Sequence, residues 1–207
     1  MKVSKRCQYA LRALVDMGIA QALGCPLVRI GDLAQKENLP VHFLEQIFLQ
    51  LKEAGYIESK RGKQGGYFLA MPAEEIKFGE VMRLLDGSLA PIPCVSRSAY
   101  EPCSCPDEAY CGVHLLMSEV HRAVTEIFDR VTLADIVKKT LRKFRRNKVT
   151  VPFVKMVMRA SSSKRKAVPE APKKKPASRR NAARRNAGPM ARAKSRLKTG
   201  SSRKQTR

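Results

Sequence analysis

The chain has 207 residues and a formal net charge of +23, and nearly all of that charge lies at one end. Residues 1–144 hold 19 basic and 17 acidic residues, whereas residues 145–207 hold 22 basic residues and one acid, Glu170. No apolar run approaches the ~20 residues needed to cross a bilayer, and no acid/base pair, nucleophile motif or phosphate-binding loop supports an enzyme. We therefore expect a non-enzymatic, cytoplasmic protein whose basic tail binds the nucleic acid of the nucleoid.

The first half of the chain predicts four helices and one β-hairpin. The helices are expected at 4–23, 30–36, 40–54 and 78–86, and the strands at 56–60 and 66–70. Ser4 suits the N-cap of the first helix, and Asn38 suits a left-handed turn before the third. The third helix should bury Leu44, Ile47, Phe48 and Leu51, and the fourth should bury Phe78, Val81, Leu84 and Leu85. The strands flank a glycine-rich basic turn, which is typical of a hairpin.

Residues 113–131 predict a long helix with an apolar stripe along one side. The stripe consists of Leu116, Val120, Ala123, Val124, Ile127 and Val131. The small core of one chain cannot cover so long a stripe, so we expect a second copy to cover it in a homodimer. Thr132 suits the N-cap of one further helix, which ends near Phe144. From Ser161 onward the sequence has no pattern that could be buried, and we expect disorder there.

These elements define a mainly α fold with a small β-hairpin. We divide it into a winged helix-turn-helix DNA-binding domain (1–88), a cysteine-rich loop (89–112), a dimerisation helix with the short helix after it (113–144) and a basic tail (145–207). The order of short helix, turn, helix and basic hairpin is typical of a winged helix-turn-helix. The same order also fits a small helical domain that binds no nucleic acid.

The start of the third helix and the hairpin turn carry the candidate DNA contacts. Gln46 can hydrogen-bond an adenine edge, and Phe43 can contact a thymine methyl group. Arg61 and Lys63 in the wing can reach a phosphate or the minor groove. Gly62 permits a positive φ and a close approach to a backbone. These residue types predict an operator site on double-stranded DNA as the partner.

Three segments carry a resemblance to a known family. They are SKRCQYALRALVDM near the start, FLEQIFLQLKEAGYIESKRGKQGGYFLA through the third helix and the wing, and EVMRLLDG before the cysteines. Together they resemble the Rrf-two family of bacterial transcription regulators, the IscR/NsrR/CymR type, over roughly residues 1–143. The resemblance implies a dimer whose third helix enters the major groove, with DNA-facing residues His42, Phe43, Glu45, Gln46 and Arg61.

Four cysteines lie close together before the long helix: Cys94, Cys103, Cys105 and Cys111, followed by His114. Clustered thiols in a reducing compartment bind metal more often than they form disulfides. The spacing C-x8-C-x-C-x5-C contains no C-x2-C pair, which weakens a zinc site, and it does not match a ferredoxin. The spacing alone therefore leaves iron–sulfur, zinc and metal-free readings open.

The resemblance favours iron–sulfur, because cluster-binding members of that family carry three cysteines in this loop, some in the pattern C-x5-C-x5-C-x2-H. Cys105, Cys111 and His114 reproduce the last three positions of that pattern, while Cys94 stands further away and Cys103 is additional. We therefore expect a [2Fe–2S] cluster held by Cys94, Cys103, Cys105 and Cys111, with His114 as the alternate ligand. The remaining cysteines, Cys7 and Cys25, are expected to be ordinary buried residues.

Three alternatives remain at this stage. The chain could be a non-specific DNA-architecture protein that acts through its basic tail, a zinc-stabilised regulator, or a metal-free sensor that forms disulfides among the clustered cysteines. The signal, the operator sequence and the choice between repression and activation do not follow from the residues.

Overall fold

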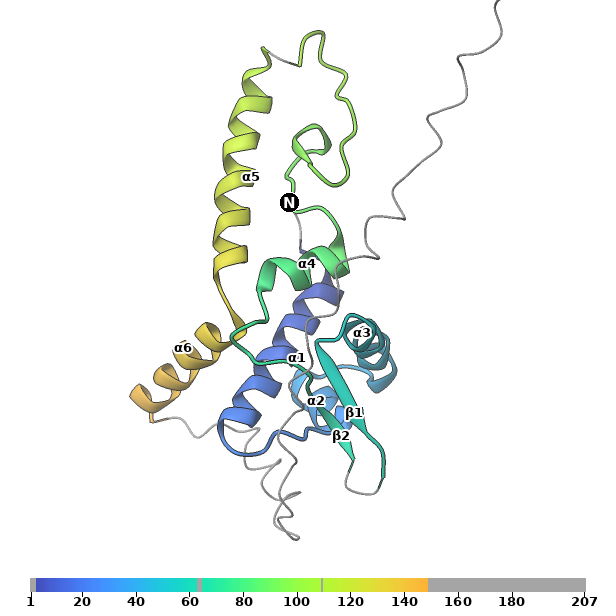
Figure 1. The fold of residues 1–207 in the computed structure, drawn as a ribbon, viewed down its shortest axis with the longest axis vertical. Coiled ribbons are helices and arrows are strands. Elements are labelled where there is room, and N and C mark those ends of the chain that lie inside the picture. Colours follow the sequence, from blue (N-terminus) through green and yellow to red (C-terminus); the bar gives the residue numbers. More distant parts are fainter. Residues whose placement is uncertain (1–2, 63–64, 109, 149–207) are drawn as a thin grey trace, which may run out of the picture. The chain divides into compact units, whose positions relative to one another are not determined.

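The computed structural model describes residues 3–62, 65–108 and 110–148, all within one compact unit (Figure 1). Its elements are α1 (Lys5–Ala22), α2 (Ile30–Glu37), α3 (Val41–Glu53), β1 (Ile57–Lys60), β2 (Gly66–Leu69), α4 (Phe78–Asp86), the 3-10 turn η1 (Pro93–Val95), α5 (Gly112–Arg130) and α6 (Leu133–Arg146). The predicted mainly α fold with one hairpin is confirmed. No described helix is long and apolar enough to cross a membrane.

α1 is the central helix, against which α2, α3, β2, α4 and α6 all pack. Ser4 caps it as predicted, because its side chain accepts a hydrogen bond from the Cys7 N–H at 3.0 Å. Its buried side includes Ala10, Ala13 and Gly18, whose small size lets neighbouring helices approach closely. Cys7 is fully buried and Cys25 is 8% exposed, as predicted.

The helix-turn-helix is formed by α2 and α3. Asn38 adopts the predicted left-handed conformation with φ 53°, and the Leu39 N–H donates to the Ala34 carbonyl at 2.9 Å. The predicted inner stripe of α3 is confirmed, because Leu44, Ile47, Phe48 and Leu51 are all 0% exposed. Pro40 is the N-cap of α3 and therefore lies just outside the first turn. This burial fixes which side of α3 faces outward.

β1 and β2 form an antiparallel hairpin in which Ile57 pairs with Leu69 and Lys60 with Gly66. The sheet is extended by a bridge between Val28 and Tyr67, which joins the hairpin to the start of the helix-turn-helix. The Tyr67 ring meets the Phe48 ring edge-on, with centroids 4.8 Å apart. The wing is thus packed directly against the buried side of α3.

α4 joins the winged domain to the long helix α5. Val81 and Met82 are buried, whereas Leu84 is 42% exposed, so the expectation that Leu84 is buried is wrong. Leu84 lies on the outer side of the helix, because Met82 takes the inward position next to Cys7 and Leu89. Asp129 of α5 contacts Arg83 of α4 at 2.5 Å, which ties the two helices together.

α5 and α6 complete the described chain. α5 has no buried residue at all, and its Leu116, Val120 and Ile127 are 55%, 41% and 52% exposed. Thr132 caps α6 as predicted in a reciprocal capping box with Asp135. α6 packs its apolar side against α1, and it continues two residues past the predicted end at Phe144. Residues 149–207, which include most of the predicted basic tail, lie outside the described residues.

Candidate DNA-binding surface and cysteine loop

The outer side of α3 presents the polar side chains that the sequence assigned to DNA. His42, Glu45 and Gln46 are all exposed. His42 Nδ1 lies 3.7 Å from Glu45 Oε2, so these two side chains are neighbours on one helical face. Because the opposite side of α3 is fully buried, this face can enter a groove while the helix stays seated on the core.

Phe43 differs from its predicted companions because it is only partly exposed. Its ring meets the Tyr9 ring of α1 edge-on, with centroids 5.9 Å apart and planes at 88°. The ring also packs against the main core. Phe43 therefore fixes α3 against α1 and presents only part of its surface outward.

The wing carries the second set of predicted contacts. Arg61 and Gly62 are exposed, and Gly62 has φ 116°, a conformation that favours glycine. At Gly65 a Cβ atom would stand 2.2 Å from the Lys60 carbonyl oxygen, so any side chain there would break the turn. Lys63 lies outside the described residues. The described part of the turn thus depends on glycine to bring its backbone together.

Two ion pairs link α2 to α1. Lys36 contacts Asp16, and Arg12 Nε lies 2.6 Å from Glu37 Oε2. Both carboxylates are almost fully buried, with side chains 6% and 4% exposed. Burial raises the pKa of Asp16 above its ordinary value, and the hydrogen bond and charge of Lys36 oppose that rise. Sequence reasoning missed this pair of contacts, because nothing in the helical pattern marks Asp16 as buried.

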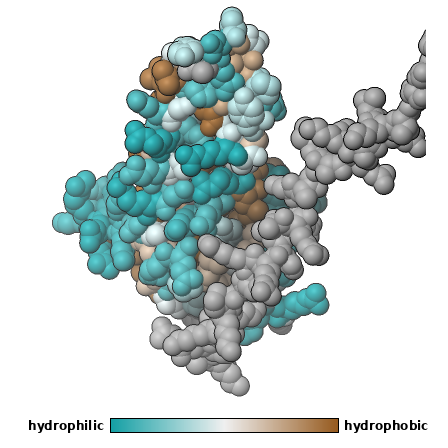
Figure 2. All heavy atoms as spheres, turned by 45° about the horizontal axis from the view of Figure 1, so that its top comes forward, coloured by the Kyte–Doolittle hydropathy of each residue, from teal (hydrophilic) through white to brown (hydrophobic). Residues whose placement is uncertain are grey.

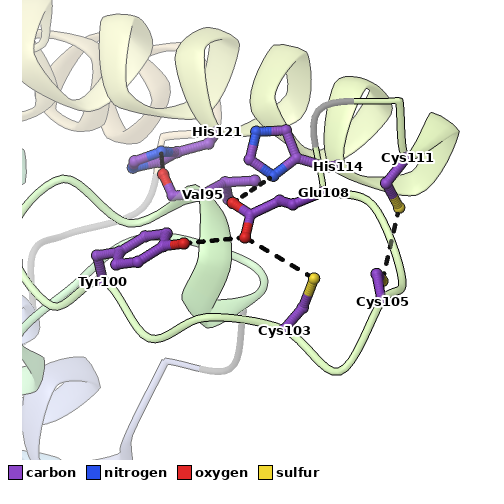
Figure 3. A network of polar contacts seen from close by, with 8 residues as sticks. All are labelled: Val95, Tyr100, Cys103, Cys105, Glu108, Cys111, His114 and His121. Carbon is purple, nitrogen blue, oxygen red and sulfur yellow. Dashed lines mark hydrogen bonds and ion pairs between the residues drawn. The ribbon is translucent and has the colours of Figure 1, made fainter.

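Figure 3 shows three of the four predicted thiols, Cys103, Cys105 and Cys111, in the cysteine loop near Glu108 and His114. Cys105 Sγ lies 3.8 Å from Cys111 Sγ. Cys94 is buried, with 7% of its surface exposed. The structure therefore brings Cys105 and Cys111 into contact, although the four cysteines span eighteen residues of sequence.

Glu108 occupies the middle of this loop, and sequence reasoning did not single it out. Its Oε2 accepts a hydrogen bond from Tyr100 Oη at 2.9 Å and lies 3.9 Å from Cys103 Sγ. Its Oε1 lies 3.5 Å from Nδ1 of His114, the alternate ligand, whose side chain is 26% exposed (Figure 3). One carboxylate thus contacts a cysteine and the histidine together.

The thiols differ in their ease of ionisation. Hydrogen bonds with Cys103 and Cys111 raise the pKa of Cys105 to about 12. The backbone N–H of His114, in the first turn of α5, lowers the pKa of Cys111. Burial is the main cause that raises the pKa of Cys94. Cys111 is therefore the thiol that the folded chain prepares best as a thiolate, which is the form that binds metal.

One pair of thiols in the loop has the separation expected of two ligands on one metal. Two sulfurs on one tetrahedral metal with ~2.3 Å bonds stand roughly 3.8 Å apart, which is the separation of Cys105 and Cys111. Within the described residues, however, no three His, Cys, Asp or Glu side chains converge as a ready metal site. A structural zinc needs four ligands at one point, whereas each iron of a [2Fe–2S] cluster takes only two from the protein.

The loop is tied to the long helix. Nδ1 of His121 on α5 lies 3.1 Å from the carbonyl oxygen of Val95 (Figure 3). Val95 directly follows the buried Cys94 in the chain. Ser96 is 5% exposed and its hydroxyl lies 2.7 Å from that of Ser88, which follows α4. The segment around Cys94 therefore contacts both α5 and the end of the winged domain.

Comparison with known proteins agrees with this architecture. Residues 3–139 match the Rrf2 family, described as an iron-dependent transcriptional regulator. An rrf2-like regulator of Rhodobacter capsulatus is 37% identical over 136 residues, which are 65% of this chain and 91% of the relative. The regulator IscR of Cereibacter sphaeroides is 41% identical over 86 residues, which are 42% of this chain and 56% of that protein.

Solved structures of the same kind are similar in fold. CymR, the global cysteine regulator of B. subtilis, has a TM-score of 0.57 at 28% identity, covering 67% of this chain and 98% of CymR. T. potens IscR has a TM-score of 0.50 at 28% identity, covering 68% of this chain and 88% of IscR. The winged helix, its exposed α3 and these likenesses define a transcriptional regulator, not an enzyme. The chain belongs to the Rrf2 family.

Proposed function

We propose that this regulator binds a specific operator in double-stranded DNA through the outer face of α3 and the wing. The observation that carries the proposal is the exposed, polar face of α3 opposite a completely buried stripe. Gln46 would read an adenine edge, His42 and Glu45 would face neighbouring bases, and Arg61 would reach a phosphate. Partly buried Phe43 would set the depth of α3 and offer its outer edge to a thymine methyl group.

Two copies of the chain would form the active regulator. α5 supports this proposal because three of its stripe residues, Leu116, Val120 and Ile127, are between 41% and 55% exposed. In Figure 2 apolar side chains interrupt the hydrophilic surface near the top of the molecule, which in Figure 1 holds the start of α5 and the loop that precedes it. A second α5 packed on this stripe would remove the apolar surface from water and set the distance between two α3 helices.

The cysteine loop would hold a [2Fe–2S] cluster through Cys94, Cys103, Cys105 and Cys111. The 3.8 Å separation of Cys105 Sγ and Cys111 Sγ supports one ligand pair, and Cys94 and Cys103 would supply the second. His114 remains the alternate ligand, because Glu108 orients its ring toward the loop. When bound, such a cluster supplies a one-electron redox centre whose loss or oxidation can be sensed.

The chain's own contacts suggest how the loop would act on DNA binding. The Val95 carbonyl accepts from His121 on α5, and Ser96 contacts Ser88 beyond α4. A change in the order of this loop would therefore alter how α5 meets the winged domain, and with it the spacing of the two α3 helices. The preferred half-site spacing would change accordingly. The basic residues of 145–207 would add binding to DNA phosphates without sequence preference, and would hold the protein on the nucleoid in the cytoplasm.

Anaerobic purification with iron and sulfide analysis tests the cluster. We expect coloured protein with two iron and two sulfide per chain, and we expect Cys111→Ser to lose both while Cys25→Ala keeps them. Colourless protein with stoichiometric zinc would contradict the cluster. One observation favours a second candidate, a metal-free thiol sensor, because Cys105 and Cys111 already touch. That candidate predicts colourless, metal-free protein in which a mild oxidant such as diamide takes two electrons and two protons and leaves a Cys105–Cys111 disulfide.

Selection of DNA sequences tests the operator proposal separately. Full-length protein incubated with a random duplex library should enrich a short, roughly palindromic sequence, and footprinting should show a discrete protected site. Gln46→Ala should reduce that enrichment at one base position in each half-site. Enrichment of no sequence would contradict the proposal and favour a DNA-architecture protein.

A further inference from the structure

α6 carries an exposed basic surface that the operator-binding elements do not use. Its six basic residues are all exposed: Lys138, Lys139, Arg142, Lys143, Arg145 and Arg146. The opposite side of the helix is firmly packed, because Leu133 and Val137 are 1% and 5% exposed in the main core. The left side of the molecule in Figure 2, where α6 lies in Figure 1, is dominated by hydrophilic side chains.

Four of these cations form a single row. Lys139, Arg142, Lys143 and Arg146 follow the spacing i, i+3, i+4 and i+7, which places them on one face of the helix. On a helical projection this row is opposite to the side formed by Leu133, Val137 and Phe144. We call these four residues the outer basic face.

Among the described residues no carboxylate forms an ion pair within 4.0 Å with the outer basic face, although hydrogen bonds from Thr132, together with the charge of Lys139, lower the pKa of Asp135. The one acid of α6, Asp135, accepts hydrogen bonds from Thr132 in the capping box. Like charges three and four residues apart destabilise a helix. The helix dipole favours cations in the last turn, where Lys143 and Arg146 lie, but Lys139 and Arg142 precede that turn.

The charge and shape of this face point to a phosphate backbone as its partner. Protein interfaces place apolar anchors at their centre, whereas α6 has no large hydrophobic residue among the exposed ones of the described chain. The row extends roughly 10 Å along the helix axis. Duplex DNA carries one charge per ~1.7 Å of its axis, so about six phosphates, counted on both strands, lie within that length of duplex. A row of cations without apolar anchors fits such a surface.

The position of α6 separates it from the operator-reading surface. α3 and α6 both pack on α1, and they lie on opposite sides of it (Figure 1). We propose that the outer basic face binds the sugar–phosphate backbone of duplex DNA outside the half-site read by α3. The inference rests on the proposed DNA binding, and it adds a second, sequence-independent contact that is built into the folded domain.

The test neutralises the outer basic face in the full-length chain. The variant is Lys139→Gln/Arg142→Gln/Lys143→Gln/Arg146→Gln, and glutamine keeps nearly the helix propensity of lysine and arginine. A matched control removes four exposed charges elsewhere: Lys5→Gln/Lys77→Gln/Arg97→Gln/Arg122→Gln. Affinity for a random-sequence 40-base-pair duplex is measured at several salt concentrations. Affinity for a selected operator is measured in the same way, with and without flanking base pairs. Circular dichroism verifies that both variants are folded.

We expect the slope of log affinity against log salt to become shallower by about 0.9 for each lost phosphate contact, and by up to about 3.6 in total. The control should keep the wild-type slope. The wild type should gain affinity when flanks are added to the operator, whereas the α6 variant should gain little, and both should select the same sequence. An unchanged slope, or an equal change in the control, would overturn the proposal. A wild type that selects no operator defeats the operator proposal alone, because the slope on random duplex still tests α6.

Discussion

Gly18 of α1 lies close to the side chains of α6, and its substitution gives a prediction of definite sign. A Cβ atom at Gly18 would lie 2.7 Å from Val137 Cγ2 and 3.5 Å from Leu133 Cγ. Replacing glycine with alanine inside a helix normally stabilises it by roughly 0.5–1 kcal/mol. Overpacking of a well-packed core costs typically about 1–3 kcal/mol. The second effect is the larger, so we expect Gly18→Ala to lower the free energy of unfolding by about 1 kcal/mol.

Urea unfolding of the full-length protein measures this change, and a double-mutant cycle tests its cause. Val137→Ala removes the methyl group that the new Cβ would strike, so Gly18→Ala should stabilise the protein when made in that background. The two substitutions should therefore couple by at least about 1 kcal/mol. If Gly18→Ala alone stabilises the wild type by the ordinary helix amount, the close packing of α6 on α1 is refuted.

Three further predictions concern other parts of the chain. Gln46→Ala should weaken operator binding about 5- to 150-fold, as measured by fluorescence anisotropy. The free energy of unfolding should not change, because Gln46 is exposed. Equal binding by the variant and the wild type would show that Gln46 does not contact the operator. Ile127→Asp, at a position 52% exposed, should give monomers in sedimentation velocity without loss of helix content; an unchanged mass would place the dimer interface elsewhere. Burial raises the pKa of Asp16 in the folded protein. The protonated Asp16 carboxyl therefore contributes fully to the free energy of unfolding below the unfolded-state pKa of about 3.9, and this contribution is lost as pH rises through the folded-state pKa. Asp16→Asn should therefore show a smaller fall in unfolding free energy between about pH 4 and pH 7 than the wild type; a larger fall would contradict the assigned cause.

The periodic elements of the fold could be predicted from the sequence because local signals agreed with burial. Ser4 and Thr132 mark helix starts, and Asn38 marks a left-handed turn, each through hydrogen bonds within a few residues. The pattern failed at Leu84, since the fourth helix is covered on two sides and the choice between Leu84 and Met82 depends on the distant Cys7 and Leu89. The helical spacing of apolar residues does not reveal contacts with residues that are distant in the sequence.

The candidate sites also divide into residues that local sequence patterns predict and residues whose roles depend on distant contacts. The exposure of His42, Glu45 and Gln46 follows from the buried stripe of α3, so sequence reasoning could find these residues. Glu108 could not be found in that way, because its contacts with Tyr100, Cys103 and His114 depend on the path of an irregular loop. The same irregular path brings Cys105 Sγ within 3.8 Å of Cys111 Sγ and places His114 beside Glu108.

The central claim is that the cysteine loop governs how the regulator binds DNA. Footprinting and affinity measurements on a selected operator test it most directly, with anaerobically purified protein before and after removal of iron by a chelator. The account predicts that removal changes operator affinity at least tenfold, or changes the preferred half-site spacing, while the Cys111→Ser variant behaves like the iron-free protein in both preparations. Identical footprints and affinities for the two forms of the wild type would contradict it.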